Sequence, residues 1–310
     1  MFFLINIPGV IVMDVKPYLT IEEQLQLLKD RGLYVDDDDE AMHMLHDLNY
    51  YRLSGYMLTL KKGDHFYSNI HFSDIMQIYN FDRELKGIML FWLEEVEIAL
   101  RTHIAYIMGK HGNTSYQDPS NFISDVHHEK FLEELQGALS DNKNEAFIKH
   151  HNTKYGGTLP VWVVVETLSF GAVSRLFTSL NIDIKKDICE DYYFGIPPKY
   201  IENWLEGLVV VRNLCAHHAR LFNRGLPNAI AFSRQEFSYL LDCGYDSNAV
   251  GKKLFFPVII MDRLSPASSE WFRNTFADLR RKYPFVDIKH YGFMRDWESI
   301  LDKLNKNYFY

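Results

Sequence analysis

With 310 residues, the chain is long enough for one large domain or two small ones with a substantial core. Hydrophobic residues make up 47% of it and charged residues 24%, the proportions of an ordinary globular protein, and its net charge is −8. This charge excludes a protein that binds nucleic acid through bulk positive charge, so any nucleic-acid site must be a local basic patch on an acidic surface.

The N-terminus opens with an apolar stretch, MFFLINIPGVIV, that differs from the rest of the chain. No basic residue precedes it, Pro8 and Gly9 interrupt it, and it is too short to span a bilayer. We interpret residues 1–12 as an extension outside the folded domain, with a weak membrane or partner contact as the alternative. No other segment approaches the roughly 18 apolar residues of a transmembrane helix, and we therefore predict no membrane association.

Three cysteines, Cys189, Cys215 and Cys243, include no C-x-x-C pair. Their odd number and spacing argue against a disulfide framework and against a cysteine zinc site. The pattern favours a reducing environment, and we predict a cytoplasmic location.

The periodicity after the N-terminal stretch is helical almost throughout. Thr20 and Glu23 form a capping-box pattern at the start of a predicted helix that Gly32 ends. An acidic run suits the positive end of a second predicted helix, which extends over residues 35–56. Residues 73–110 contain no proline and predict one long helix.

Further helices are predicted over residues 129–141, 159–180 and 199–224. The valine-rich run 161–165 is β-prone and leaves a strand open there, although the leucines that follow favour a helix. The tail predicts two or three more helices, the clearest at residues 268–283. We therefore predict an all-α fold. Residues 13–230 are predicted to form a bundle of long helices. Residues 231–310 are predicted to form a C-terminal helical annex packed on the same core.

Chemistry-bearing residues concentrate in VVVRNLCAHHARLFNR, residues 209–224. At about 100° per residue, a helix places Asn213, His217, Arg220 and Arg224 on one stripe, in line with Glu206 and Glu202 about two and three turns earlier. On the same helix His218 points to the apolar side, as a partly buried residue. The alternative for the stripe is a solvated helix face, whose members could include the i, i+4 ion pairs common on helices.

These residue types suit the cleavage of RNA. A histidine can take the proton of the 2′-hydroxyl or protonate the leaving 5′-oxygen, and an arginine can hold the scissile phosphate. Because the 2′-hydroxyl is an internal nucleophile, no metal or other cofactor is expected. Arg220 and Arg224 would contact neighbouring phosphates. Arg212 and His217 lie about 140° apart on one helix, so a two-fold homodimer is the arrangement that would bring them together.

The segment R-N-L-C-A-H, from Arg212 to His217, resembles the R-x(4–6)-H motif of HEPN domains in its R-N-x-x-A-H form. Other segments, in the same order and spacing, are similar to those of the Abi-type abortive-infection proteins of bacteria, the AbiD/AbiF group. The resemblance covers roughly residues 13–300. The segments that carry it are KPYLTIEEQLQLLKDRGL (16–33), YYRLSGYMLTL (50–60), FDRELKGIMLFWLEEVEIALRTHIAYIM (81–108), PVWVVVETLSFGAVSRLF (160–177) and RNLCAHHARLFNR (212–224).

This resemblance implies a HEPN-like helical bundle and a metal-independent endoribonuclease toxin in anti-phage defence. It places the catalytic residues at Arg212 and His217 with Asn213 beside them, at a homodimer interface. It also implies an RNA substrate and a small RNA antitoxin as a partner. Two alternatives stay open: a non-catalytic HEPN module that binds a small RNA or a protein, and a metal phosphohydrolase built on residues such as His46 and Asp47.

Two other groups have a structural and a functional interpretation. Glu97 and Arg101 match a Glu…Arg pair of the family and are either an ion pair that fixes helix packing or a pair that orients the Arg212–His217 site. Tyr50, Tyr51 and Tyr56 are predicted to pack in the core or at a dimer interface, with stacking on RNA bases as the alternative.

Overall fold

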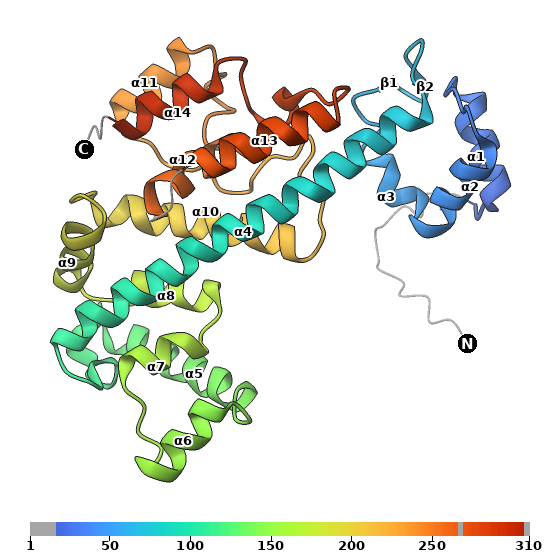
Figure 1. Ribbon diagram of the computed structural model, residues 1–310. Coiled ribbons are helices and arrows are strands. Elements are labelled where there is room, and N and C mark those ends of the chain that lie inside the picture. Colours follow the sequence, from blue (N-terminus) through green and yellow to red (C-terminus); the bar gives the residue numbers. More distant parts are fainter. Residues whose placement is uncertain (1–16, 266–268, 307–310) are drawn as a thin grey trace, which may run out of the picture. The chain divides into compact units, whose positions relative to one another are not determined.

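The computed structural model describes residues 17–265 and 269–306 (Figure 1), so the predicted extension at residues 1–12 lies outside the described part. Fourteen α-helices, three short 3₁₀ helices and one two-stranded hairpin form the regular structure of these residues. The predicted all-α fold is confirmed. The chain divides into two compact units between Tyr79 and Asn80, inside its longest helix.

The described residues of the first unit, 17–79, form three helices, one hairpin and the start of the long helix α4. Its elements are α1 (Ile21–Asp30), α2 (Asp38–Asp47), α3 (Tyr50–Ser54), the antiparallel strands β1 (Lys61–Lys62) and β2 (His65–Phe66), and the first turns of α4 (Phe72–Lys110).

Local signals in the first unit are partly confirmed. The capping box of Thr20 and Glu23 at the start of α1 is present as predicted. The single helix predicted over residues 35–56 is wrong, because α2 ends at Asp47 and the backbone is non-helical at Leu48 and Asn49. The Asn49 side chain accepts a hydrogen bond from the Tyr51 amide and so begins α3 as a separate helix.

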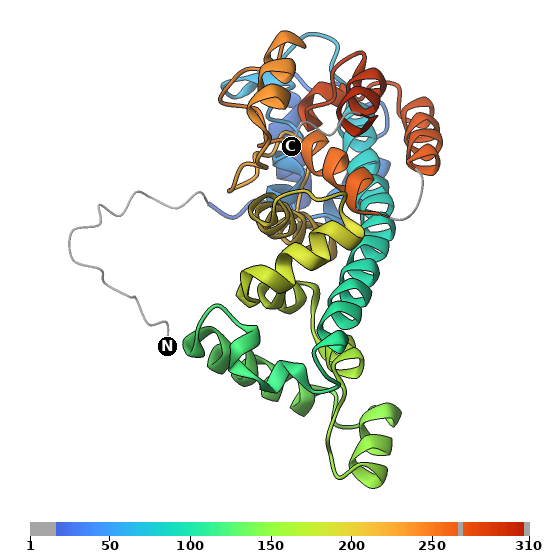
Figure 2. The same cartoon turned by 90° about the vertical axis from the view of Figure 1, so that its left-hand side faces the viewer.

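The second unit begins at Asn80 and contains the rest of α4 with all later elements. Within it, α5 and α7 lie by the C-terminal end of α4, while α12 to α14 lie farther toward its N-terminal side (Figures 1 and 2). The elements are η1 (Ser115–Gln117), η2 (Pro119–Asn121), α5 (Asp125–Asp141), α6 (Ala146–Lys154), α7 (Val161–Thr167), α8 (Phe170–Ser179), α9 (Ile182–Tyr192), α10 (Pro198–Ala216), α11 (Arg234–Asp242), α12 (Phe255–Leu264), α13 (Glu270–Lys282), η3 (Ile288–Tyr291) and α14 (Trp297–Lys306).

The valine-rich run after Pro160 is helical despite its β-propensity. Val161, Val164 and Val165 are buried at i, i+3 and i+4, so one face of α7 packs into the core, and this burial outweighs the local preference. The single helix predicted over residues 159–180 is nevertheless interrupted. The Ser169 side chain accepts from the Ala172 amide and begins α8 as a new helix.

Helix α10 is the central packing element of the second unit, with α8, α9 and α12 against it. Its buried Trp204 donates its indole N–H to the Ala231 carbonyl at 2.7 Å. The guanidinium of Arg263 on α12 lies 5.2 Å from the Trp204 ring and forms a fully buried ion pair with Glu236 on α11 at 2.6 Å. The helices after residue 231 are therefore anchored on α10 by polar as well as apolar contacts.

Acid should weaken this unit through His103 on α4. The ring stacks on Tyr192 of α9 at 3.9 Å, and its Nδ1 lies 3.0 Å from the Tyr193 hydroxyl. Burial lowers the pKa of His103 from 6.5 to about 4. The unfolded chain then binds the proton first as the pH falls below 6.5, so stability from this group is present above pH 6.5 and is lost toward pH 4.

We expect wild-type protein to lose about 1–2 kcal/mol of unfolding free energy from this source between pH 7 and pH 5, after allowing for solvent screening of a partly exposed ring. Urea unfolding of wild type and His103→Phe at both pH values measures it. The phenylalanine variant keeps the stacking but cannot titrate, so its loss over this interval should be smaller. An equal loss in both proteins would contradict the assignment to His103.

Candidate functional site

Helix α10 ends at Ala216, so the helix predicted over residues 199–224 is wrong in its last two turns. His217 is the C-cap residue, and His218 adopts a left-handed backbone with φ of 55°. The amide of His218 donates to the Cys215 carbonyl at 3.1 Å, and that of Ala219 to the Leu214 carbonyl at 2.8 Å. This is a Schellman motif in which His218 takes the position that glycine usually fills.

A buried carboxylate on α4 holds the chain after it leaves the helix. Asp82 is fully buried and accepts the amide N–H of Leu221 at 3.2 Å and that of Phe222 at 2.8 Å. It also accepts the Tyr291 hydroxyl at 3.0 Å and forms an ion pair with the buried Lys86 at 3.0 Å. These bonds anchor the loop of residues 217–222 at its end, where Leu221 and Phe222 are buried.

The predicted catalytic residues lie at this fixed helix end. Arg212 is half-buried on the last turns of α10 and donates to the exposed Asn213 side-chain oxygen at 3.2 Å. His217 is exposed, as predicted from its place with the polar residues. His218 is also exposed, so the prediction that it is partly buried is wrong, because the helix phase used for it does not extend past Ala216. In the described structure no hydrogen bond joins Arg212 to His217.

The predicted RNA-contacting arginines lie on the loop rather than on the helix. Arg220 is half-buried and donates to the Phe222 carbonyl at 2.5 Å, while Arg224 is exposed. Lys253 lies beside them, 3.5 Å from the Asn223 side-chain oxygen, and its pKa is lowered by burial and by the charge of Arg220. Arg220 and Lys253 are thus close enough for their charges to interact, and the exposed Arg224 follows Asn223 directly in the chain.

The glutamates of the predicted stripe are engaged elsewhere. Glu202 forms an ion pair with the buried Lys185 of α9 at 2.7 Å, and Glu206 accepts from the Asn228 side chain at 2.6 Å. They fix the packing of the N-terminal half of α10 and do not continue the stripe toward His217.

Glu97 and Arg101 form the predicted ion pair, at 2.5 Å, on α4. Arg101 also donates to the Leu168 carbonyl at 2.8 Å and lies 3.6 Å from Glu166, so the pair ties α4 to the α7–α8 junction. In the described structure, neither Glu97 nor Arg101 forms a hydrogen bond or ion pair with Arg212 or His217. An orienting role toward that site stays a prediction.

Sequence reasoning missed Asp82, which is the residue that shapes the site. Its signal was present, since Asp82 and Lys86 stand at i, i+4 within an apolar helix, the spacing of an ion pair.

In the part of the chain that the structure describes, no three His, Cys, Asp or Glu side chains are grouped as a metal site would require. Over residues 17–265 and 269–306, no helix combines the length and apolar character needed to cross a bilayer.

The central region of the chain matches a known protein family. A family model described as Abi-like protein matches residues 43–223, which is more than half of the chain. The match includes α4, α7, α8 and α10 with the Arg212–His217 segment, and it confirms the resemblance to Abi-type proteins. Neither the curated proteins nor the solved structures searched gave a match.

Proposed function

This chain belongs to the Abi-like protein family, and we propose that it acts in abortive-infection defence as a metal-independent endoribonuclease. The observation that carries the proposal is the exposed His217 at the fixed end of α10, five residues after Arg212. In the reaction, the 2′-oxygen of RNA attacks the adjacent phosphorus and the bond to the 5′-oxygen breaks. The products are a 2′,3′-cyclic phosphate and a 5′-hydroxyl.

Each side chain has a role that its position supports. His217 is the acid–base group, because its imidazole is exposed on a loop that Asp82 holds in place. Arg212 binds the scissile phosphate, and Asn213, which accepts its N–H at 3.2 Å, orients the guanidinium. Arg220 and Arg224, on the chain that follows the helix end, contact neighbouring phosphates.

We further propose that the active form is a homodimer. Arg212 and His217 make no hydrogen bond within one chain, and both stand at the same end of α10. A two-fold axis beside this end would bring the arginine of one copy to the histidine of the other. The RNA substrate would then bind in a cleft to which both copies contribute, and a small RNA antitoxin could restrain the protein by occupying it.

Product chemistry tests the proposal. Purified protein should cleave RNA in the presence of excess EDTA and leave 2′,3′-cyclic phosphate and 5′-hydroxyl ends, since the nucleophile belongs to the substrate. The 5′-hydroxyl ends are detected by direct labelling with polynucleotide kinase, without prior phosphatase treatment. Cleavage that EDTA abolishes and Mn²⁺ restores would contradict the mechanism and favour a metal phosphohydrolase. RNA binding that Arg212→Ala weakens, with no cleavage in any preparation, would indicate the non-catalytic module instead.

A further inference from the structure

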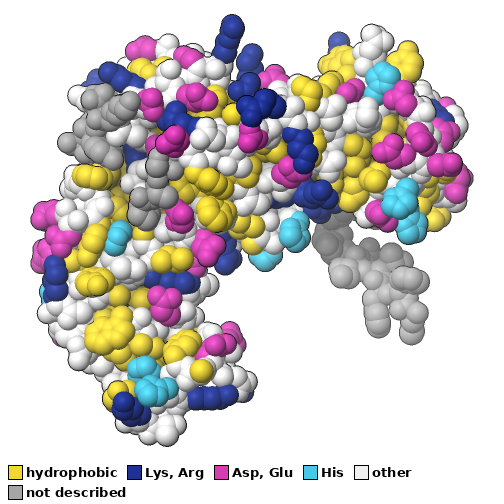
Figure 3. Space-filling view, viewed as in Figure 1, with side chains coloured by type: hydrophobic (Ala, Val, Ile, Leu, Met, Phe, Trp, Pro, Cys, Tyr) yellow, Lys and Arg dark blue, Asp and Glu magenta, His cyan; other side chains and the backbone are white. Residues whose placement is uncertain are grey.

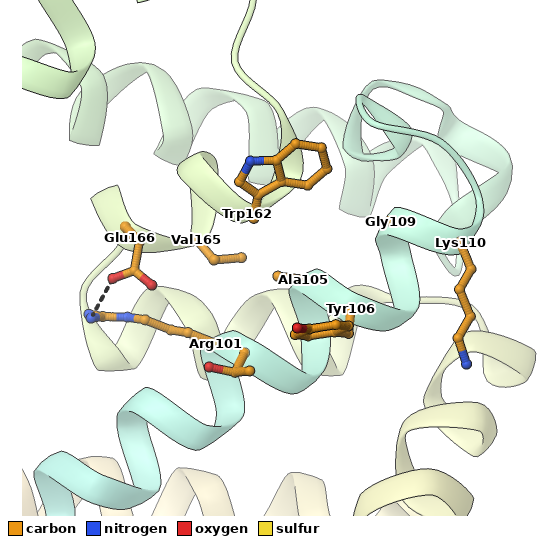
Figure 4. Close-up of a pocket in the computed structure, with 9 residues that line it drawn as sticks. Arg101, Ala105, Tyr106, Gly109, Lys110, Trp162, Val165 and Glu166 are labelled. Atoms are coloured by element: carbon orange, nitrogen blue, oxygen red, sulfur yellow. Dashed lines mark ion pairs between the residues drawn. The ribbon is translucent and has the colours of Figure 1, made fainter.

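A cavity of about 570 Å³ opens between the C-terminal part of α4 and α7 (Figure 4). Trp162 of α7 and Tyr106 of α4 lie on opposite sides of it, with the small residue Ala105 between them (Figure 4). The two aromatic side chains are 48% and 66% exposed. Both rings border the cavity and make no ring contact with each other in the described structure, so each can stack on a base of its own.

One end of this cavity is polar. The Arg101 Nε–H is buried and has no hydrogen-bond partner among the described residues, although the rest of the guanidinium is well bonded. Glu166 stands beside it with its carboxylate more than half exposed. That nitrogen is too deeply buried for a ligand to reach, whereas the neighbouring Glu166 carboxylate can accept N–H groups and repels phosphate. The edge of a nucleobase, which carries N–H donors and no charge, suits this end of the cavity.

A second cavity, of about 520 Å³, shares Trp162 with the first. His151 of α6 and Tyr155 directly after that helix line it, so aromatic rings continue past the indole. Residues 142–158 contain three lysines against one glutamate, in a chain whose net charge is −8. Figure 3 shows these basic and histidine side chains gathered with hydrophobic ones over α6. The segment is the kind of local basic patch that nucleic-acid binding by an acidic protein requires.

We propose that the two cavities form a binding track for single-stranded RNA, separate from the Arg212–His217 site. Trp162, which lines both cavities, stacks on one base, Tyr106 stacks on a neighbouring base, and Lys154, whose ammonium lies 5.2 Å from the Tyr155 ring, contacts a phosphate. The inference rests on the proposed function, because it takes RNA as the substrate and assigns where part of that RNA is held. Glu97 and Arg101 then orient a wall of the track rather than the catalytic residues.

Binding measurements on the full-length chain test the track. A fluorescein-labelled single-stranded RNA of twelve nucleotides is titrated by anisotropy with His217→Ala protein, which should bind without cutting. Adding Trp162→Ala or Tyr106→Ala should raise Kd by about tenfold or more, the usual cost of losing a base-stacking ring. Adding Lys154→Ala should weaken binding and reduce its dependence on salt. The matched control is Trp271→Ala, since Trp271 is 40% exposed and lines neither cavity, and it should leave Kd unchanged.

The outcomes separate this inference from the proposed function. Unchanged affinity in both Trp162→Ala and Tyr106→Ala would overturn the track even if the wild-type protein cuts RNA. Trp162-dependent binding by a wild-type protein that cuts nothing would support the track and reject the nuclease. Equal competition by double-stranded RNA would overturn the track, because stacking needs unpaired bases. Loss of a dimer in Trp162→Ala, seen by sedimentation with RNA absent, would also overturn it and assign the cavities to an interface between copies.

Discussion

Replacing His217 with alanine should lower the RNA cleavage rate by about 10²–10⁴-fold, the usual contribution of an acid–base group, while His218→Gly should stay within a few-fold of wild type. The His217 side chain is exposed at the helix end, so its removal should leave the fold intact. His218 adopts a φ of 55° in the Schellman turn, a backbone that glycine favours. The two adjacent histidines therefore have different roles. His217 supplies the imidazole for acid–base catalysis, whereas His218 occupies the left-handed position of the turn.

Single-turnover cleavage of a labelled RNA measures both variants, with thermal unfolding to show that each is folded. The reverse result, an inactive His218→Gly and an active His217→Ala, would transfer the catalytic role to His218. The same measurement addresses the dimer. If Arg212 of one copy works with His217 of the other, then Arg212→Ala and His217→Ala proteins, each inactive alone, should regain activity when mixed. A mixture that stays inactive after subunit exchange would place both residues of a site in one chain.

The helices that could be predicted from sequence are those whose limits are set locally. Thr20 and Glu23 cap α1 through bonds three residues apart, and an apolar run without proline carries α4 over its whole length. The sequence pattern predicts neither α6 nor α9, and it underestimates the number of helices after residue 231, where the described residues form four α-helices. Short helices with weak periodicity depend on the surface they pack against, which a local pattern does not contain.

The end of α10 shows why part of the candidate site could not be predicted. Residues up to Phe222 fit a helical pattern, yet the helix stops at Ala216, and Asp82, far earlier in the chain, accepts the amides of Leu221 and Phe222 beyond that end. Arg212 and His217 were found because their spacing is itself the signal. Trp162 and Tyr106 were not, because they face one cavity only once α4 and α7 lie together (Figure 4). Of the tyrosines predicted to pack in the core or at a dimer interface, Tyr56 is buried against Tyr79 as predicted, whereas Tyr51 is exposed.

Replacing Asp82 with alanine should lower the free energy of unfolding by about 3–5 kcal/mol, because it leaves the charge of Lys86 buried without a partner. It should also abolish cleavage at temperatures where the variant is still folded. The amides of Leu221 and Phe222 and the Tyr291 hydroxyl lose their shared acceptor, so the loop that carries His217 is no longer held. Urea unfolding and single-turnover cleavage, both at low temperature, measure the two effects.

Two further variants separate the buried charge from the anchoring of the loop. Adding Lys86→Met to Asp82→Ala removes the unpaired charge and should recover part of the stability but none of the activity, because the loop amides still lack an acceptor. Glu236→Ala breaks another fully buried ion pair, with Arg263, and should cost a similar amount of stability while folded protein still cleaves RNA. Recovery of cleavage along with stability in the double variant would mean that Asp82 acts only on the fold. Activity that stays lost in a restabilised protein would mean that this carboxylate sets the geometry of the His217 loop.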